Sequence, residues 1–422
     1  ISTITGPSLI PSLKISHEIK KKFDIPIIWG GIHPTMLPEQ TLNSASVDIV
    51  VIGEGEETLV DLTKAAAERK PDKNDLKNIP GIAYKNNHGV IINPSRPFIQ
   101  DLDVYSPAWH LLPIEKYFYS DKFFLSDFGS RPPGKRLASY LSSRGCPWRC
   151  GYCYNQFVNK RRFRAHSAGK VIKDIQKLKE NYDISSVIFE DDNLFTDKKR
   201  ALEIIRGIRL PWSSSLRAND IARWGSDFIK ELKDNQCAEL RIGAESGSDR
   251  ILGLMQKDIT VQDIRTSVEL CQKHGIRPLL NFMIGIPGET WPEMLDTFDL
   301  MDKLESRGPD VVVNGPSLYY PWPGTALYDQ AVEQGFIPPR NMPDWSSGWS
   351  HRQPVGPYVD KRAKYIGYYR ILAFRKDLDS LRFPFLAKVM RSIARWRWKK
   401  RFFRFPFDYH LPNSIYRLLK LL

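Results

Sequence analysis

The feature that most constrains the fold is a regular alternation of apolar segments with amphipathic stretches between residues 137 and 330. Strand-like segments are expected at 137–145, 185–192, 212–219, 238–246, 277–285 and 311–320. Helical stretches between them are expected to start near Gly169, Asp197, Ser226, Thr260 and Glu289, where Ser, Thr and Asp are good N-cap residues. A closed (β/α) barrel has eight strands, two more than this pattern provides. We therefore expect an open, partial (β/α)6 barrel in an α/β protein.

Residues 1–70 show a similar alternation. The strand-like segments Ile1–Gly6, Ile25–Gly31 and Val47–Gly53 are each followed by a helix-like stretch. This pattern predicts a second parallel sheet with helices on its faces, of the flavodoxin-like or Rossmann-like kind. Three strands are few for such a domain and the chain opens with Ile inside the first of them, so we expect the front of the domain to be missing.

Two further segments complete the predicted domain organisation. Residues 71–136 should hold a hairpin over Gly81–Asn93, with Asn86, Asn87 and Gly89 at its turn, and then a connector. The barrel is assigned to 137–330, and 331–422 is a helical extension in which Trp345 is expected to pack in a core.

Three cysteines lie within eight residues, just beyond the first predicted barrel strand. The segment reads Cys146-Pro-Trp-Arg-Cys150-Gly-Tyr-Cys153. Thiolates at this spacing could hold three irons of a [4Fe–4S] cluster and leave the fourth iron open. A structural zinc site with His166 or Cys237 as fourth ligand is the alternative, but such sites usually pair their cysteines in two separated knuckles.

The CxxxCxxC motif after the first strand of a partial barrel resembles the radical S-adenosylmethionine (SAM) superfamily. The resemblance implies that SAM binds at the open iron, with its contacts at the carboxyl ends of the strands, where barrel active sites assemble. By their positions in the motifs, the implied SAM-binding residues are Tyr152, Glu190, Asp192, Arg217, Glu245, Ser246 and Gly285.

Charge supports the same assignment. Glu190 and Asp192, in the acidic run after the second strand, could hold an ammonium group, and Arg217 could pair with a carboxylate. Each feature alone has a plainer explanation. The acidic run could belong to the N-cap region of the helix at Asp197, and Arg217 could simply pair with Asp220 or Glu245.

Small residues follow the second N-terminal strand, in Trp29-Gly30-Gly31-Ile-His33, and they would let a bulky group approach the backbone. Together with the order of motifs around it, this segment resembles the cobalamin-binding domain that precedes many radical SAM barrels. The implied cobalamin-binding residues are Ser2, Thr5, Gly30, Gly31 and His33. His33 is expected to line the pocket of the nucleotide tail or to cap the next helix, and not to ligate cobalt.

A nicotinamide cofactor is not expected. Gly53-Glu-Gly55 is weakly similar to a dinucleotide fingerprint, but Thr58 occupies the place of its third glycine. The Asp-x-His-x-x-Gly loop of some cobalamin proteins would lie before the start of this chain, so the lower ligand of cobalt stays open.

Positive charge is concentrated near the end of the chain. The sequence carries 62 Lys and Arg against 48 Asp and Glu, a net charge of +14, which predicts an anionic partner. Between residues 380 and 407, nine basic residues occur without an acidic one, and apolar residues recur at helical spacing (Leu386, Val389, Met390, Ile393 and Trp396). A basic amphipathic helix of this kind could lie on an anionic membrane, pack on the barrel or, as a third alternative, bind RNA.

Compartment and function follow from these features as expectations. No apolar run reaches the ~20 residues of a membrane span and no signal peptide is visible, so a cytoplasmic location is expected, with peripheral membrane contact through the basic C-terminus. The resemblance implies an enzyme that cleaves SAM reductively at a [4Fe–4S] cluster and transfers a methyl group, through cobalamin, to an unactivated carbon of a small anionic or lipid-like molecule. A reductase, flavodoxin or ferredoxin would donate the electron.

Two rival functions stay open at this point. One is a cobalamin-type radical SAM cyclase or oxidoreductase acting on a tetrapyrrole-like or lipid-like substrate. The other is a non-catalytic scaffold that binds a cluster or zinc and is recruited to a membrane or to RNA by its basic tail. Nucleic acid is the less favoured partner because no RNA-binding module accompanies the tail.

Overall fold

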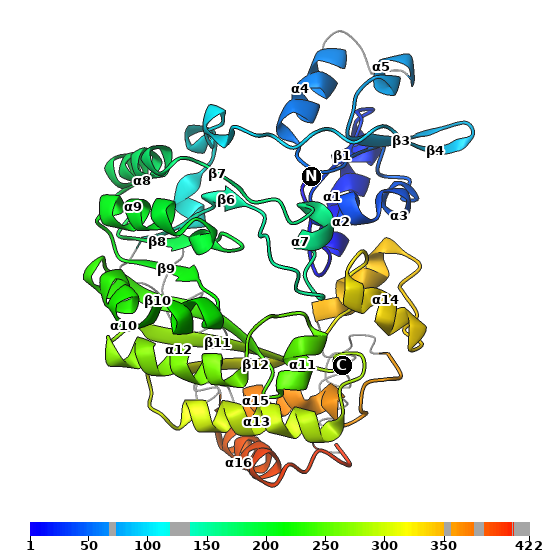
Figure 1. The fold of residues 1–422 in the computed structure, drawn as a ribbon. Coiled ribbons are helices and arrows are strands. Elements are labelled where there is room, and N and C mark those ends of the chain that lie inside the picture. Colours follow the sequence, from blue (N-terminus) through cyan, green and yellow to red (C-terminus); the bar gives the residue numbers. More distant parts are fainter. Residues whose placement is uncertain (67–72, 119–135, 350–355, 375–383, 407, 409–422) are drawn as a thin grey trace. The chain divides into compact units, whose positions relative to one another are not determined.

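The computed structural model describes residues 1–66, 73–118, 136–349, 356–374, 384–406 and 408 (Figure 1). It divides into two compact units, and the chain passes between them more than once. The first unit comprises residues 1–100, 152–161 and 320–356, and the second comprises 101–151, 162–319 and 357–422. Among the described residues, no helix combines the length and the apolar character needed to cross a membrane.

The second unit is built on a six-stranded sheet with the order β12-β11-β10-β9-β8-β5. All five neighbouring pairs are parallel. The strands are β5 (Leu137–Tyr140), β8 (Ser186–Phe189), β9 (Trp212–Ser215), β10 (Cys237–Glu245), β11 (Arg277–Ile284) and β12 (Val312–Leu318). Because each strand lies beside the next one along the chain, the order has no reversal point, as in a (β/α) barrel. The predicted partial (β/α)6 barrel is confirmed.

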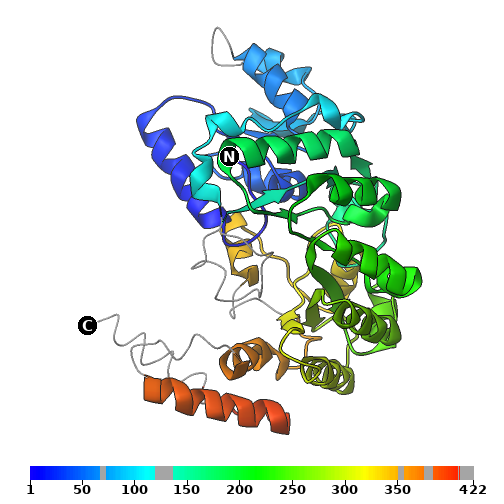
Figure 2. The ribbon, with the colours of Figure 1, turned by 90° about the vertical axis from the view of Figure 1, so that its left-hand side faces the viewer.

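Helices lie along the outer face of this sheet (Figures 1 and 2). They are α8 (Ala168–Tyr182), α9 (Lys198–Ile208), α10 (Ala218–Asp234), α12 (Val261–Lys273) and α13 (Trp291–Glu305). The predicted caps at Asp197 and Thr260 are confirmed, because their side chains accept hydrogen bonds from backbone N–H groups in the first turns of α9 and α12. α10 consists of two helical segments that meet at the non-helical Gly225 (φ 74°), so a helix starts at the position predicted near Ser226, and a further helical segment precedes it from Ala218.

Alternation along β10 separates an apolar face from a polar one. Leu240, Ile242 and Ala244 are fully buried, which is typical of residues that pack against the covering helices. The alternate residues, Glu239 and Arg241, therefore point to the opposite, inner face of the sheet. The inner face of the partial barrel is thus polar where an ordinary closed barrel would be filled by apolar side chains.

A short two-stranded ribbon precedes the cysteine motif. The expected strand 137–145 is divided into β5 and β6 (Ser143–Arg144), and β6 pairs antiparallel with β7 (Arg164–Ala165). The cysteines therefore lie between the two strands of this ribbon.

The first unit contains a four-stranded sheet with the order β1-β2-β3-β4. β1 (Ile28–Trp29) and β2 (Ile49–Val51) are parallel, whereas β3 (Ile82–Asn86) and β4 (Gly89–Ile92) continue the sheet in antiparallel fashion. The predicted hairpin is confirmed, and so is the parallel pairing within residues 1–70; the hairpin extends the same sheet in antiparallel fashion. The expected strand Ile1–Gly6 is reduced to one parallel bridge, from Ser2 to Gly30.

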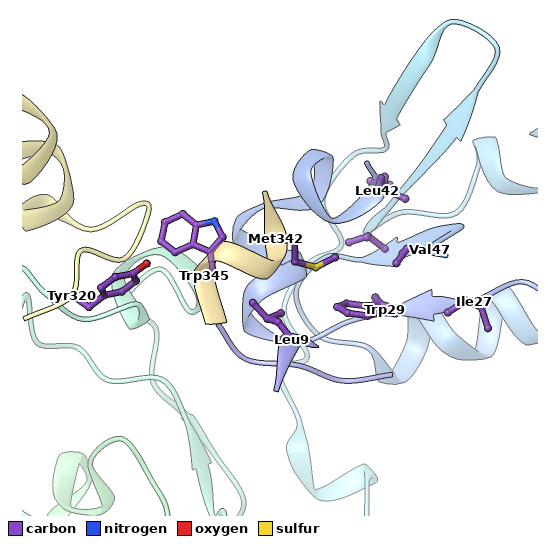
Figure 3. Close-up of a cluster of buried hydrophobic side chains, with 10 residues drawn as sticks. Leu9, Ile27, Trp29, Leu42, Val47, Tyr320, Met342 and Trp345 are labelled. Atoms are coloured by element: carbon purple, nitrogen blue, oxygen red, sulfur yellow. The ribbon is translucent and has the colours of Figure 1, made fainter. Parts of the chain in front are cut away.

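The core of the first unit joins segments that are far apart in sequence (Figure 3). Leu9 and Trp29 from the N-terminal part pack with Tyr320, Met342 and Trp345. The indole nitrogen of Trp29 donates a hydrogen bond to the Ser16 hydroxyl at 2.9 Å, so its one polar atom is satisfied. The prediction that Trp345 packs in a core is confirmed. The helices of this unit are α1 (Leu9–Lys22), α2 (Ile32–Met36), α3 (Pro38–Leu42), α4 (Glu56–Ala65), α5 (Lys73–Lys77), α7 (Asn155–Val158) and α14 (Ala326–Glu333).

The C-terminal extension forms α15 (Ile366–Phe374) and α16 (Pro384–Lys400), which pack against each other. The predicted basic helix is confirmed, but its buried face is not the predicted apolar stripe. Arg397 and Trp398 are buried, and the Arg397 guanidinium pairs with Asp408 at 2.6 Å. Val389 and Trp396, from the predicted stripe, are 39% and 52% exposed.

Candidate functional site

The cysteine motif lies at the carboxyl end of the first barrel strand. Cys146 and Cys150 belong to the second unit, and Cys153 follows two residues after Gly151, in the segment 152–161 of the first unit. All three are free thiols, and Cys150 is buried while the other two are half-buried. The loop is fastened on one side by a backbone hydrogen bond of 2.7 Å from Gly151 N–H to the carbonyl of Met255.

The chain before the motif is fixed by a buried polar cluster. The Asp191 carboxylate accepts hydrogen bonds from the Ser142 backbone (3.2 Å), from the Ser142 hydroxyl (2.8 Å) and from the Ser143 hydroxyl. Arg200 on α9 donates to the Ser142 carbonyl and hydroxyl, both at 2.8 Å. Burial raises the pKa of Asp191 against the effect of these bonds. Asp191, the middle residue of the acidic run, therefore orients the chain that enters the cysteine loop.

The two outer members of the acidic run remain accessible after β8. Asp192 is exposed, and the Glu190 side chain is 42% exposed and pairs with Arg241 at 2.9 Å. Arg241 also donates to the Phe189 carbonyl at 2.6 Å, which ties β10 to the end of β8. Glu190 already has Arg241 as a partner, so the binding of an ammonium group by these two carboxylates stays a prediction.

Arg217 ends beside one of the cysteines. It is the N-cap residue of α10, is 8% exposed, and its Nη1 donates to the Cys150 Sγ at 3.5 Å. Its Nη2 donates to the Lys257 carbonyl, and its Nε donates to the Asn219 side chain at 3.3 Å. These three partners are protein groups, so the contact with a SAM carboxylate stays a prediction.

The end of β10 holds a buried ion pair. Glu245 Oε1 and Lys257 Nζ are 3.0 Å apart, and both side chains are less than a tenth exposed. Glu245 has φ 65° and follows a shift of the strand register at Gly243. The next hydroxyl, of Ser246, lies 3.2 Å from the Thr297 hydroxyl on α13. Both predicted SAM residues thus lie in a tightly packed turn, and their contact with SAM stays a prediction.

The turn after β11 is held by a carboxylate that the sequence suggested only as a helix start. Glu289 accepts backbone hydrogen bonds from Gly285 and, at 3.1 Å, from Ile286. Burial raises the pKa of Glu289 to about 7. Gly285 has φ 82°, and a Cβ there would lie 2.8 Å from the Leu318 side chain, so close packing in this unit already requires glycine.

Sequence reasoning missed the polar residues inside the barrel. Gly243, Asn281 and Asn314 are neighbours across β10, β11 and β12, and the two Asn side chains lie 3.4 Å apart. Deeper along β10, Glu239 is buried, and burial raises its pKa to about 7. The period-two alternation of the strands carried the signal, because polar residues at every second position of β10 mark an inner face that binds polar groups.

The predicted cobalamin residues gather at the carboxyl end of β1. The Thr5 hydroxyl lies 3.0 Å from Nδ1 of His33, which is completely buried. Nε2 of His33 is buried without a hydrogen-bond partner in the described structure, and burial lowers the pKa of this imidazole to about 4. His33 does not cap α2 through its side chain, so that alternative for its role is wrong.

Two glycines at this edge differ in the space around them. Gly31 has φ 99°, and a Cβ there would lie 2.4 Å from the Thr3 carbonyl, so this glycine lets the chain start pack beside β1. Gly53, after the parallel strand β2, has φ 82° and open space where its Cβ would be. The exposed Ser2 bridges to Gly30 at the same edge. An open backbone at the ends of two parallel strands fits a bulky ligand.

The zinc alternative lacks a fourth ligand. His166 Nδ1 lies 3.3 Å from the Asp103 carboxylate, and Cys237 is buried at the start of β10, where burial raises the pKa of its thiol well above the usual value. Within the described ranges, no group of three or more His, Cys, Asp and Glu side chains is arranged around a single metal ion, and this includes the three cysteines of the loop, so the finding does not separate zinc from a cluster.

Two stretches of the chain match known protein families. Residues 140–301 match the radical SAM superfamily, and residues 1–63 match the B12 binding domain. The chain therefore belongs to the radical SAM superfamily and carries a B12-binding domain before its barrel. This membership assigns it a [4Fe–4S] cluster, SAM and cobalamin as cofactors. The three free thiols in one loop fit the cluster, since thiolates are its usual ligands.

The chain is similar in sequence to relatives that are named for different activities. An uncharacterized methyltransferase of Pyrococcus horikoshii is 32% identical over 331 residues, which are 77% of this chain and 66% of the relative. An anaerobic magnesium-protoporphyrin IX monomethyl ester cyclase of Rubrivivax gelatinosus is 27% identical over 351 residues, 79% of this chain and 59% of the relative. The chain thus spans less than two thirds of either relative.

Solved structures share the fold. The radical SAM methyltransferase TsrM from Kitasatospora setae, with cobalamin and a [4Fe–4S] cluster bound, has a TM-score of 0.60 at 21% identity, covering 77% of this chain and 61% of that chain. The cobalamin-dependent SAM radical enzyme OxsB, in its apo form, has a TM-score of 0.66 at 18% identity, covering 92% and 60%.

Proposed function

We propose that the protein is a cobalamin-dependent radical SAM methyltransferase that modifies an unactivated carbon of a small molecule. The observation that carries the proposal is the presence of a B12-binding match and a radical SAM match in one chain, with three free cysteines in a loop at the carboxyl end of the first barrel strand. When bound, the cluster and SAM supply one-electron cleavage of a carbon–sulfur bond, and cobalamin supplies a carrier for the methyl group.

In this proposal the protein groups bind and orient. Cys146, Cys150 and Cys153 hold the cluster through their thiolates. The accessible carboxylates of Glu190 and Asp192 attract the SAM ammonium group. The remaining SAM contacts are assigned to Tyr152, Arg217, Glu245, Ser246 and Gly285, and the cobalamin contacts to Ser2, Thr5, Gly30, Gly31 and His33.

The test is anaerobic reconstitution with iron and sulfide, followed by reduction in the presence of SAM and cobalamin. Chromatography then measures 5′-deoxyadenosine and S-adenosylhomocysteine, with Cys150→Ala as the control variant. Formation of both products, dependent on Cys150 and on cobalamin, is the expected result. An intact cluster that binds SAM without yielding either product would refute the proposal and favour a non-catalytic scaffold.

A cyclase is the second candidate function, favoured by the 27% identity to the Rubrivivax cyclase. The two candidates differ in the fate of the SAM methyl group. With methyl-labelled SAM, a methyltransferase places the label in the product, whereas a cyclase forms 5′-deoxyadenosine without such transfer. We propose a flavodoxin or ferredoxin as the physiological electron donor, and replacing dithionite by either protein tests it.

We further propose that α16 contacts an anionic membrane surface. Val389 and Trp396 are exposed on this helix, and the exposed residues Lys399 and Lys400 add positive charge. Co-sedimentation with vesicles that contain phosphatidylserine should exceed co-sedimentation with neutral vesicles, and Trp396→Ala should weaken it. Equal recovery with both vesicle types would contradict this contact.

A further inference from the structure

We propose that Arg217 is a positioning residue that raises the reduction potential of the iron–sulfur cluster by donating a charged hydrogen bond to the Cys150 sulfur. The inference rests on the proposed function, because it presupposes that Cys150 ligates the cluster. It assigns Arg217 a task toward the cluster that differs from the SAM contact implied by its place in the sequence.

The position of Arg217 is fixed by contacts on several sides. Nη1 lies 3.5 Å from Cys150 Sγ, Nε bonds to the Asn219 side chain at 3.3 Å, and Nη2 bonds to the Lys257 carbonyl. The Trp148 ring, two residues before Cys150, lies 4.0 Å from the guanidinium carbon. A guanidinium group held in this way cannot move away from the Cys150 sulfur without losing several other contacts.

The charge of Arg217 is not neutralised by a direct ion pair. Within the described part of the chain, no carboxylate lies within ion-pair distance of this guanidinium, and the side chain is almost completely buried. Asp220, the nearest acidic residue along the chain, pairs with Arg223 at 2.7 Å, and its carboxylate also interacts with the charge of Arg217 beyond ion-pair distance. The positive charge therefore acts on the sulfur with little screening by solvent.

A fixed cation beside a ligand sulfur favours the reduced cluster. One-electron reduction adds a negative charge to the cluster, and hydrogen bonds to its sulfurs and nearby charge are among the factors that set its potential. Because the guanidinium stabilises the added charge, it raises the potential. A given electron donor then reduces the cluster to a greater extent.

The effect of the Arg217–Cys150 contact can be distinguished experimentally from a general effect on the cysteine loop. Arg149 lies in the same cysteine loop, but it points to Asp258 at 3.0 Å and its side chain is 57% exposed. Arg149→Gln therefore removes an arginine charge from the same loop while the Arg217–Cys150 hydrogen bond stays in place, and it serves as the matched control.

The test compares wild type, Arg217→Gln, Arg217→Lys and Arg149→Gln after reconstitution, with iron and sulfide content measured for each. The midpoint potential is read from the EPR signal of the reduced cluster during a redox titration. Arg217→Gln should lower the equilibrium constant for reduction about tenfold, a shift of about 59 mV to more negative potential for one electron. Arg217→Lys should shift the potential less, and Arg149→Gln should leave it at the wild-type value.

The outcomes separate this inference from the proposed function. A wild-type chain that forms no cluster overturns both. An intact cluster in Arg217→Gln with the wild-type potential overturns the role of Arg217 alone, as does an equal shift in Arg149→Gln. If Arg217→Gln fails to take up iron, a second neutral variant, Arg217→Met, decides, because a potential equal to that of wild type then overturns the inference and a lower one supports it.

Discussion

The buried imidazole of His33 predicts a specific loss of stability in mild acid. His33 is completely buried, and burial lowers the pKa of its ring to about 4, against 6.5 in the absence of burial. Below pH 6.5 the unfolded chain takes up a proton at this residue that the folded chain does not bind. Stability is therefore complete above the unfolded pKa, falls as the pH decreases from 6.5, and stops falling once the pH passes the folded pKa.

The size of the effect follows from the same two values. At 1.36 kcal/mol per pKa unit, the full difference amounts to about 3 kcal/mol. Between pH 7 and pH 5, where the folded ring is still mostly neutral, linkage gives a loss of about 2 kcal/mol.

The assay is urea unfolding at pH 7, 6 and 5, with the free energy extrapolated linearly to water. His33→Gln is the matched variant, because glutamine is neutral throughout this range and can still hydrogen-bond to Thr5. The free energy of unfolding should fall by about 2 kcal/mol more in wild type than in His33→Gln. Parallel curves for the two proteins would refute the reasoning, and NMR titration of the labelled ring would then locate its pKa directly.

Three further substitutions test the second unit by urea unfolding. Lys257→Met should cost about 3–5 kcal/mol by leaving Glu245 buried without this partner, and a cost below about 1 kcal/mol would show that the pair behaves like an exposed one. Gly247→Ala should cost about 1–3 kcal/mol, because its Cβ would lie 2.3 Å from a backbone oxygen of α13. Gly253→Ala, with open space around it, is its control and should not destabilise. Asp191→Ala should cost about 1–3 kcal/mol and lower the iron retained after reconstitution, and full retention would contradict its role beside the cysteine loop.

The barrel could be predicted because its signals are local. Most strands contain buried apolar residues at short spacing, although β9 reads Trp-Ser-Ser-Ser, and the caps at Asp197 and Thr260 act within one turn of their helices. The position of the cysteine motif could likewise be predicted, because it follows the first strand and the carboxyl ends of parallel strands lie at one edge of the sheet.

The partners of the site residues could not be predicted, because they come from segments that approach only in the folded chain. Arg217 reaches Cys150 across 67 residues, and Glu190 meets Arg241 across 51. Sequence placed all four near the carboxyl edge of the sheet but could not tell which charges meet. The buried face of α16 could not be predicted for a related reason, since the burial of Arg397 depends on Asp408, which forms an ion pair with it from beyond the end of the helix.

The discontinuous first unit has a consequence for the order in which the protein is made. Its core needs Tyr320, Met342 and Trp345 as well as Leu9 and Trp29. On the ribosome, the N-terminal residues emerge first but cannot complete their core until the chain has been synthesised through residue 345 of 422. The barrel strands all emerge within that interval. Until then, the apolar side of the B12-binding segment stays uncovered, both in the nascent chain and in a truncated product. Separate expression of residues 1–100 should therefore yield a fragment that aggregates.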